Sequence, residues 1–305
     1  MRFGSLVLAL GVVSAAVLSS QDRVSITPRA HPLGVASTTA NLRYDVRLIQ
    51  VPVSVTDLRG QPLVDLTKEQ FRIFEDDVEQ PISSFSIDDA PISGMLIFDS
   101  SRSMKTRLTD TRAGVEQFLN TAMPGDEFGL IRFSDRAQVL SKFTPDTDAV
   151  LRELNGVQAK GWTALFDALY LGSQQVRKGH NQRRVLVVFS DGADNNSRYS
   201  EAEMISRLRE EDLEIYAVSL YERPRTLEKV AEDTGGRAYW VRKMEELPDA
   251  IETLSRQIRS EYLIGYTPGS MQNDGKYHRI RVEVRPREGM SRLRTTWRRG
   301  YIAPE

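Results

Sequence analysis

The sequence contains no cysteine and only three histidines in 305 residues. The absence of thiols excludes disulfide bonds, thiolate metal sites and a cysteine nucleophile. The histidines, His31, His180 and His278, are far apart in the chain, which argues against a multi-histidine zinc centre. The chain also lacks the glycine-rich phosphate loop and the Gly-x-Ser-x-Gly and Gly-x-Gly-x-x-Gly patterns of common enzyme classes. These absences weigh against most familiar enzyme chemistry.

Neither sign of charge is in excess. The chain has 41 Lys and Arg residues against 42 Asp and Glu residues, a net charge of −1. Without a net positive field, binding of nucleic acid or of polyanions in general is not expected. The hydrophobic share of 40% and the charged share of 27% are ordinary for a globular protein of one large or two smaller domains.

Long apolar runs are also missing, except near the N-terminus. In residues 1–21 an arginine at position 2 precedes the apolar run Leu6–Leu18, and small polar residues follow. This order is typical of a secretory signal peptide, and the run is shorter than the ~20 residues of a bilayer span. We therefore expect export to the periplasm or the extracellular space, with an uncleaved N-terminal anchor as the alternative. Residues 22–43, rich in Ser, Thr, Ala and Pro, are predicted to be a linker.

Between residues 91 and 260, short apolar segments alternate with segments of helical spacing. Val185–Phe189 is apolar throughout, as in a strand that is buried on both faces. This alternation predicts a Rossmann-like α/β domain, with a mostly parallel central sheet and helices on both of its faces. Residues 128–133 and 137–143 are expected to form two neighbouring strands.

The segments on either side, 44–90 and 261–303, have β patterns. Val51, Val53 and Val55 alternate with other residues in the first segment, and Ile280 and Val282 alternate with charged residues in the second. Each segment is short for a β domain, but together they approach the ~100 residues of an immunoglobulin-like sandwich. We predict one discontinuous sandwich made from both segments, with the α/β domain inserted into it.

Oxygen-bearing side chains follow the predicted strands of the α/β domain. Asp99, Ser101 and Ser103 form an Asp-x-Ser-x-Ser loop, Thr163 opens a predicted helix, and Asp191 follows the strand 185–189. Ligand loops of open α/β sheets lie at the carboxyl ends of strands, so these loops are expected to converge. Two carboxylates and three hydroxyls suit a hard divalent cation, with Mg²⁺ first and Mn²⁺ or Ca²⁺ as alternatives.

This set of residues resembles the metal-ion-dependent adhesion site of von Willebrand factor type A domains, and the resemblance extends over about residues 91–260. It implies that Ser101, Ser103 and Thr163 approach the metal directly, and that Asp99 and Asp191 hold it largely through water. It also implies that one coordination position is left for an Asp or Glu carboxylate of a protein partner. Absence of metal, with the two aspartates serving only as loop and cap residues, is the alternative.

The flanking segments carry a second resemblance. Asp65-Leu66-Thr67, Phe74-Glu75-Asp76 and Arg299-Gly300-Tyr301 resemble exported bacterial proteins that are grouped as the VWFA-related (acidobacterial) domain family. That likeness implies an architecture more than a function. Integrin-type sites have further acidic residues where this sequence has Met104 and Lys105, so no neighbouring cation site is predicted.

The preferred hypothesis is an exported, non-catalytic module that binds a partner's carboxylate through a Mg²⁺-type ion. Trp162, next to Thr163, is expected either to contact the partner at the rim of the site or to pack inside. A metal-dependent hydrolase is one alternative, although no general base is evident beside Asp99 and Asp191. A structural scaffold of the cell envelope is the other. The eight arginines between residues 279 and 299 are expected to cover a solvated strand face rather than to bind nucleic acid.

Overall fold

The computed structural model describes residues 48–191, 194–221, 223, 225–269, 274–286 and 292–304. The predicted signal peptide and linker, residues 1–43, lie outside the described residues, and so does His31. The chain divides into a unit of residues 1–45 and a compact unit of residues 46–305, which contains all the elements below. In the described part, no helix has the length and apolar character needed to span a membrane.

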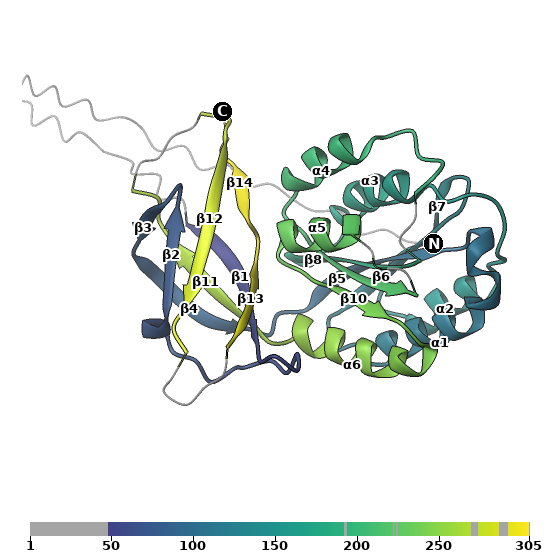
Figure 1. Cartoon of the computed structure of the whole chain (residues 1–305), viewed down its shortest axis with the longest axis horizontal. Helices are drawn as coiled ribbons and strands as arrows, with labels where there is room; N and C mark the ends of the chain where they lie inside the picture. The colour runs from purple at the N-terminus through teal and green to yellow at the C-terminus, as the bar shows by residue number, and fades with distance from the viewer. Residues whose placement is uncertain are drawn as a thin grey trace, which may run out of the picture. The chain divides into compact units, whose positions relative to one another are not determined.

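The α/β unit is built on a six-stranded sheet with the order β10-β9-β8-β5-β6-β7 (Figure 1). Its strands are β5 (Ile92–Asp99), β6 (Glu127–Phe133), β7 (Ala137–Thr144), β8 (Arg183–Ser190), β9 (Glu214–Leu220) and β10 (Ala238–Val241). Four of the neighbouring pairs are parallel, and only the pair β6–β7 is antiparallel. The sheet is therefore mostly parallel, with one antiparallel edge strand.

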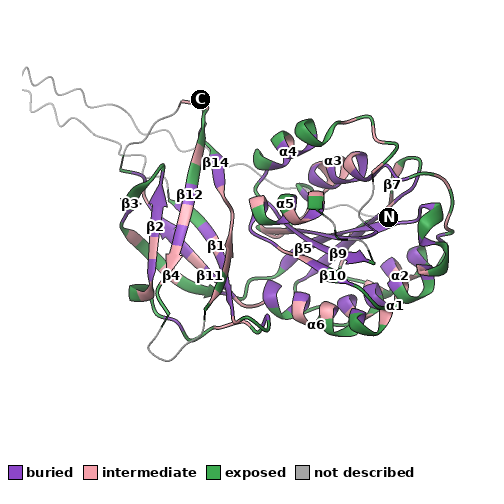
Figure 2. Cartoon of the chain, viewed as in Figure 1, coloured by how far each residue is buried: buried purple, intermediate pink, exposed green. Residues whose placement is uncertain are grey.

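Six helices cover the two faces of this sheet (Figure 1). One face carries α1 (Leu108–Leu119), α2 (Thr147–Asn155) and α6 (Leu247–Ile258), and the other carries α3 (Leu165–Val176), α4 (Glu201–Arg209) and α5 (Arg225–Thr234). Three short 3-10 helices, η1 (Lys68–Gln70), η2 (Arg102–Thr106) and η3 (Met244–Glu246), lie in connections. Each long helix is buried on the side that meets the sheet and exposed on the other (Figure 2).

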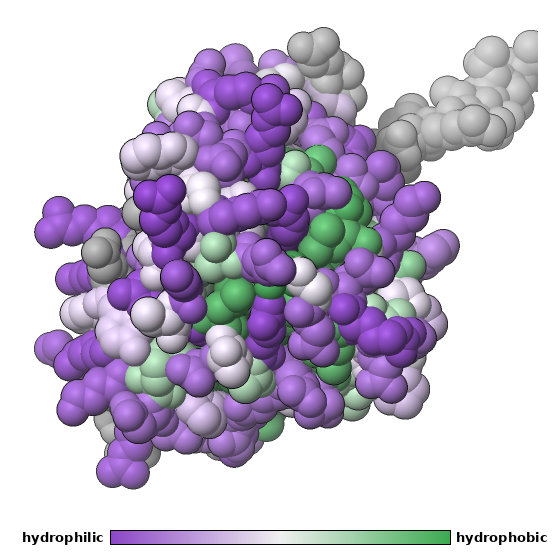
Figure 3. Space-filling model, turned by 90° about the vertical axis from the view of Figure 1, so that its right-hand side faces the viewer, coloured by the Kyte–Doolittle hydropathy of each residue, from purple (hydrophilic) through white to green (hydrophobic). Residues whose placement is uncertain are grey.

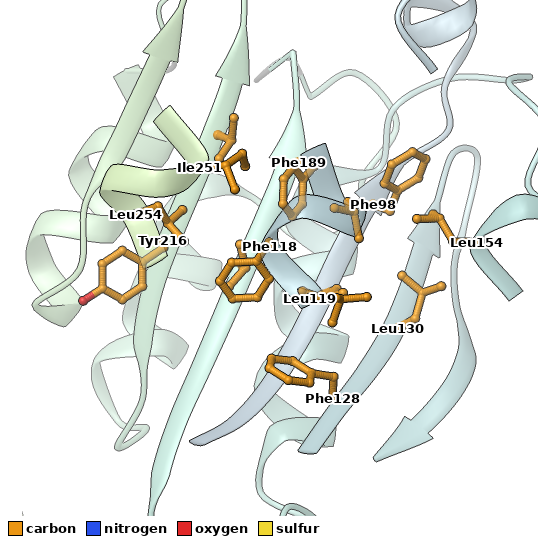
Figure 4. Close-up of a cluster of buried hydrophobic side chains, with 14 of the residues drawn as sticks. Phe98, Phe118, Leu119, Phe128, Leu130, Leu154, Phe189, Tyr216, Ile251 and Leu254 are labelled. Carbon is orange, nitrogen blue, oxygen red and sulfur yellow. The ribbon is translucent and has the colours of Figure 1, made fainter. Parts of the chain in front are cut away.

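Alternate residues of the central strands supply two separate cores. On β5, Leu96 and Phe98 belong to one core, whereas Met95 and Ile97 belong to the other, because successive side chains of a strand point to opposite faces. All eight residues of β5 are buried, which explains its apolar run Met95–Phe98. Figure 4 shows the first core, with Phe98, Leu130 and Phe189 on strands and Phe118, Leu154 and Ile251 on helices.

The strands before and after the α/β unit form two four-stranded antiparallel sheets. One sheet has the order β13-β1-β11-β4 and the other β14-β12-β2-β3. The strands are β1 (Ile49–Thr56), β2 (Phe71–Glu75), β3 (Val78–Gln80), β4 (Ile82–Asp88), β11 (Glu261–Tyr266), β12 (Tyr277–Val284), β13 (Arg294–Trp297) and β14 (Gly300–Ile302). Val53 and Ile264 of the first sheet and Ile73 and Ile280 of the second share one core, so the sheets are the two layers of a sandwich.

Both flanking segments are needed for each layer. Strand β11 lies between β1 and β4, and β12 lies between β14 and β2, so each sheet mixes strands from the two ends of the compact unit. The short strand β3 follows a two-residue turn, Asp76-Asp77, in which both residues have positive φ (47° and 67°). This is the turn that matches the twist of a tight hairpin, and aspartate tolerates it better than most residues.

The chain passes between the sandwich and the α/β unit at two places, which are joined by a buried ion cluster. Asp88 and Glu261 are paired across β4 and β11, and both lie beside Arg183 at the start of β8. Arg183 Nη2 donates to Glu261 at 2.6 Å, and its Nε lies 3.0 Å from Asp88. Burial and the neighbouring charge of Glu261 raise the pKa of the Glu214 carboxyl well above its usual value. Through Asp88 and Glu261, Arg183 links the two connections between the sandwich and the α/β unit.

Candidate metal centre

The first part of the candidate site is the end of β5 and the turn into η2. Ser100 donates from both its N–H and its hydroxyl to the Phe133 carbonyl, at 2.8 Å each, which ties the turn to β6. Asp99 Oδ1 accepts a hydrogen bond of 2.8 Å from the Ser101 N–H. The hydroxyl oxygens of Ser101 and Ser103 lie 3.0 Å apart. One buried carboxylate and two adjacent hydroxyls thus lie close together at the sheet edge.

The second part is the loop before α3, which is fixed by its backbone. Lys160 N–H donates to the Ser100 carbonyl at 2.8 Å, and the Gly161 carbonyl accepts from Arg102 N–H at 3.1 Å. Gly161 has φ of 78°, and a Cβ there would lie 2.3 Å from a carboxylate oxygen of Asp135. Only glycine fits this position without a rearrangement.

Thr163 is placed within that loop by a third segment. Its N–H donates to Asn195 Oδ1 at 2.8 Å, and its carbonyl accepts from Asn195 N–H at 3.0 Å. Asp194 Oδ1 in turn accepts from Phe166 N–H, in the first turn of α3, at 3.3 Å. Thr163 itself is buried, while the neighbouring Trp162 is 64% exposed. The segment after β8 therefore holds the loop that carries Thr163 and the first turn of α3.

Asp191 follows β8, directly beside the end of β5. The Ser190 hydroxyl donates to Asp99 Oδ2 at 2.7 Å and so links the two strand ends. Asp191 is buried, and its Oδ1 has no hydrogen-bond partner among the described residues. Its Oδ2 lies 3.5 Å from the guanidinium of Arg107. A buried carboxylate oxygen without a donor costs about 1–3 kcal/mol or more, and a cation would remove that cost.

The pKa of Asp99 depends on its burial and its neighbours. Burial raises the pKa of Asp99 to about 6; hydrogen bonds from Ser190 and Ser101 lower it, and the negative charge of Asp191 raises it further. Among the described contacts of the two carboxylates, the one positively charged group is the guanidinium of Arg107, 3.5 Å from Asp191 Oδ2. Carboxylate and hydroxyl oxygens are the ligands that hard divalent cations prefer. The donor set and the unpartnered oxygen of Asp191 fit such a cation.

The predicted site residues lie at one edge of the sheet. Asp99, Ser101 and Ser103 are connected directly, Asp191 joins them through the strand end at Ser190, and Thr163 is brought there by its backbone bonds. Their role as metal ligands stays a prediction. Asn195, four residues after Asp191, is typical of a turn in the sequence, and its contact with Thr163 fits that interpretation. Arg107 could not be predicted as a neighbour of the site, because its contact with Asp191 joins segments 84 residues apart.

A second polar cluster lies in the sandwich, around His278. Its members are Glu75, Asp76, Asp274 and His278. His278 Nδ1 lies 2.8 Å from Asp76 and its Nε2 lies 3.3 Å from Asp274. Glu75 Oε2 accepts hydrogen bonds from the hydroxyls of Tyr266, at 2.5 Å, and Tyr301, at 3.2 Å. The potential ligand atoms of Glu75, Asp76 and His278 lie within 4.8 Å of one another, but donors already surround them.

Comparison with known proteins places the α/β unit in a family. Residues 95–193 match the family model described as the von Willebrand factor type A domain. The chain contains a von Willebrand factor type A domain. The predicted α/β fold with a mostly parallel sheet is thereby confirmed. Domains of this family commonly bind a divalent metal at a metal-ion-dependent adhesion site, and they mediate protein interactions.

Two curated proteins are distantly related to this chain. A UPF0353 protein of Mycobacterium avium is 27% identical over 207 residues, which cover 56% of this chain and 62% of that protein. A UPF0353 protein of Mycolicibacterium paratuberculosis is 26% identical over 206 residues, with the same coverage. The chain thus spans about three fifths of the length of the curated relatives it matches.

Solved structures of the same fold include a von Willebrand factor type A protein from Catenulispora acidiphila. It matches with a TM-score of 0.52 and 13% identity over 76% of each chain. Proximal thread matrix protein 1 of the mussel byssus, with a zinc-occupied MIDAS motif, has a TM-score of 0.52 and 18% identity over 60% of this chain and 49% of its own. At these identities the likeness shows the fold alone.

Proposed function

We propose that this protein binds a partner protein through a divalent cation of the Mg²⁺ type held at the edge of the von Willebrand factor type A domain. Asp99, Ser101, Ser103, Thr163 and Asp191 would hold the cation. The observation that carries the proposal is the buried Oδ1 of Asp191, which has no hydrogen-bond partner among the described residues, beside the linked Asp99 carboxylate and serine hydroxyls. When bound, the cation supplies an electrophilic centre that attracts a partner's carboxylate.

The proposal is for a binding module and not for an enzyme. The described contacts of the five residues involve hydroxyls, carboxylates, backbone groups, the Asn195 amide and Arg107. None of these contacts brings a histidine to the site to act as a general base. The chain's own residues therefore support holding and orienting a ligand more directly than they support the hydrolase alternative.

The rest of the proposal concerns location and architecture. Residues 1–21 have the charge and hydropathy order of a signal peptide, which supports a role outside the cytoplasm.

The sandwich is proposed to be immunoglobulin-like. Its β1-β11-β4 order corresponds to strands B, E and D of that fold, and its β14-β12-β2-β3 order to G, F, C and C′. Strand β13 would then take the edge position next to strand B.

Calorimetric titration of the full chain with Mn²⁺ and with Mg²⁺ tests the metal centre. We expect a single site that is lost in Asp99→Ala and in Asp191→Asn, because each change removes a carboxylate oxygen from the site. Glu116→Gln, an exposed carboxylate on α1, is the matched control and should bind the cation like the unaltered protein. Equal affinity in all four proteins would remove the basis of the proposal.

A further inference from the structure

Exposed aromatic side chains gather at the edge of the sheet that carries the candidate metal centre. Four of the exposed large hydrophobic residues in the described part are aromatic, and three of them, Trp162, Tyr221 and Trp240, lie at or near the carboxyl ends of the central strands. Tyr221 and Trp240 are each 40% exposed. The side of the molecule at the right of Figure 1 is mostly hydrophilic, with hydrophobic residues gathered near its middle (Figure 3). Single exposed rings are ordinary, but three along one edge call for a reason.

Two of the rings are joined with two arginines into a continuous row. The guanidinium of Arg107 lies 4.3 Å from the centre of the Tyr221 ring, and that of Arg242 lies 4.8 Å from the Trp240 ring. Trp240 Nε1 donates to the Tyr221 carbonyl at 3.1 Å. We call Arg107, Tyr221, Trp240 and Arg242 the arginine–aromatic row.

The backbone holds this row in place. Leu220 and Val241 are partners across the parallel strands β9 and β10, so Tyr221 and Arg242, which follow them, are neighbours as well. Tyr221 N–H donates to the Val241 carbonyl at 2.7 Å. Tyr221 also has φ of 68°, a conformation that a bulky residue adopts only where the surrounding structure imposes it, often at binding sites.

One end of the row touches the candidate metal centre. Arg107 Nη1 lies 3.5 Å from Asp191 Oδ2. Arg242 is at the other end of the row and follows β10, which is the second strand along the sheet from β8. Adjacent strands are about 4.8 Å apart, so Arg242 lies about 10 Å along the edge from Asp191. An extended peptide advances about 3.4 Å per residue and turns every second side chain to the same face, so carboxylates two or four residues apart can both face this edge.

The chemistry of the row selects the kind of partner. A guanidinium stacked on a ring keeps its N–H groups at the edge of the plane, where they can bind a carboxylate with two hydrogen bonds. Tryptophan, tyrosine and arginine are also the residues that contribute most to protein interfaces. We infer that the row is a second binding surface for an extended acidic segment of the partner, which places a further Asp or Glu on Arg242 two or four residues from the carboxylate at the cation. This inference rests on the proposed function.

The test measures fluorescence polarisation of labelled eight-residue Gly/Ser peptides with the full chain, in Mg²⁺ and in chelator. One peptide contains a single Glu, and the others contain a second Glu two, three or four residues further on. We expect a second Glu two or four residues further on to give about tenfold tighter binding than the single Glu in Mg²⁺, which corresponds to one added bidentate contact. A second Glu three residues further on should give no gain, because its side chain faces away from the surface. Arg242→Ala should abolish the gain from the second Glu and leave single-Glu binding unchanged. Arg152→Ala, an exposed arginine on α2, should keep the gain.

The outcomes separate the two proposals. Binding of the single-Glu peptide that depends on Mg²⁺, with no gain from a second Glu or the same gain in Arg242→Ala, overturns the arginine–aromatic row alone. Absence of Mg²⁺-dependent binding for every peptide, in a protein that unfolds normally, overturns the proposed function and the inference together. A gain that persists in chelator also contradicts the inference, because it separates the row from the metal centre.

Discussion

The candidate metal centre and the histidine cluster of the sandwich contain similar acids in different surroundings. In the sandwich, His278 and two tyrosine hydroxyls donate to Glu75 and Asp76 or lie beside them. At the edge of the α/β sheet, and among the residues that the structure describes, Asp191 has one buried oxygen without a hydrogen-bond partner and Asp99 accepts hydrogen bonds from neutral donors. Donor supply, and not the number of carboxylates, therefore distinguishes a structural cluster from a site that is suited to a cation.

The third acidic cluster, at the two connections, contains its own buried cation, Arg183, and its disruption should have the largest effect. In Arg183→Leu, Glu261 and Asp88 would stay buried without their cation, so we expect a loss of about 3–5 kcal/mol in the free energy of unfolding. Denaturant unfolding of the full chain measures it. Arg177→Leu, an exposed arginine after α3, is the control, and an equal loss in both variants would contradict the role given to Arg183.

Cation binding should stabilise the folded protein only through the candidate metal centre, where Asp191 Oδ1 has no hydrogen-bond donor among the described residues. At a Mn²⁺ concentration of about 100 times Kd, the free energy of unfolding should rise by about 2.7 kcal/mol. Asp191→Asn should abolish this rise, whereas His278→Gln should retain it. Thermal unfolding with and without Mn²⁺ gives the measurement. Loss of the rise in His278→Gln would show that the comparison between the two clusters is wrong.

The histidine cluster should instead respond to pH. Burial lowers the pKa of His278, but its hydrogen bonds with Asp76 and Asp274 outweigh burial and raise the pKa above the usual 6.5. The stabilisation by charged His278 is therefore complete below pH 6.5 and is lost as the pH rises through the folded-state pKa. We expect His278→Gln to cost about 1 kcal/mol at pH 5.5 and less at pH 9. Unfolding at the two pH values checks this, and a cost that is independent of pH would contradict it.

The sequence predicts the α/β unit well because its signals are local. The apolar runs of β5 and β8 and the spacing of the helices follow from burial on one or two faces, and the family match confirms that part. The five oxygen ligands could be chosen because parallel strands bring their carboxyl ends to one edge. The domain boundaries, the ligand roles and the immunoglobulin-like class stay predictions.

The sequence does not show which hydrogen-bond donors distant segments bring to each carboxylate. His278 and Asp76 are 202 residues apart and meet only because β2 and β12 pair. The unpartnered oxygen of Asp191 and the approach of Arg107 depend equally on tertiary packing. In contrast, the Asp76-Asp77 turn carries a local signal, since aspartate is one of the residues that tolerate positive φ.

The smallest effect on stability is expected for a change of Trp162, at the rim of the metal centre. The Trp162 side chain is 64% exposed, and its loop is held by the backbone N–H that donates to Asp135 Oδ1 at 2.8 Å. Trp162→Ala should therefore change the free energy of unfolding by less than about 0.5 kcal/mol and leave Mn²⁺ affinity intact.

Gly161→Ala, one residue earlier, should weaken Mn²⁺ binding, because its Cβ would collide with the carboxylate of Asp135 and displace the loop that carries Thr163. Calorimetry of the two variants side by side decides the matter. If Trp162→Ala lost the metal and Gly161→Ala kept it, the ring and not the backbone would be holding the site together, and a role for Trp162 in contacting the partner would no longer follow from its exposure.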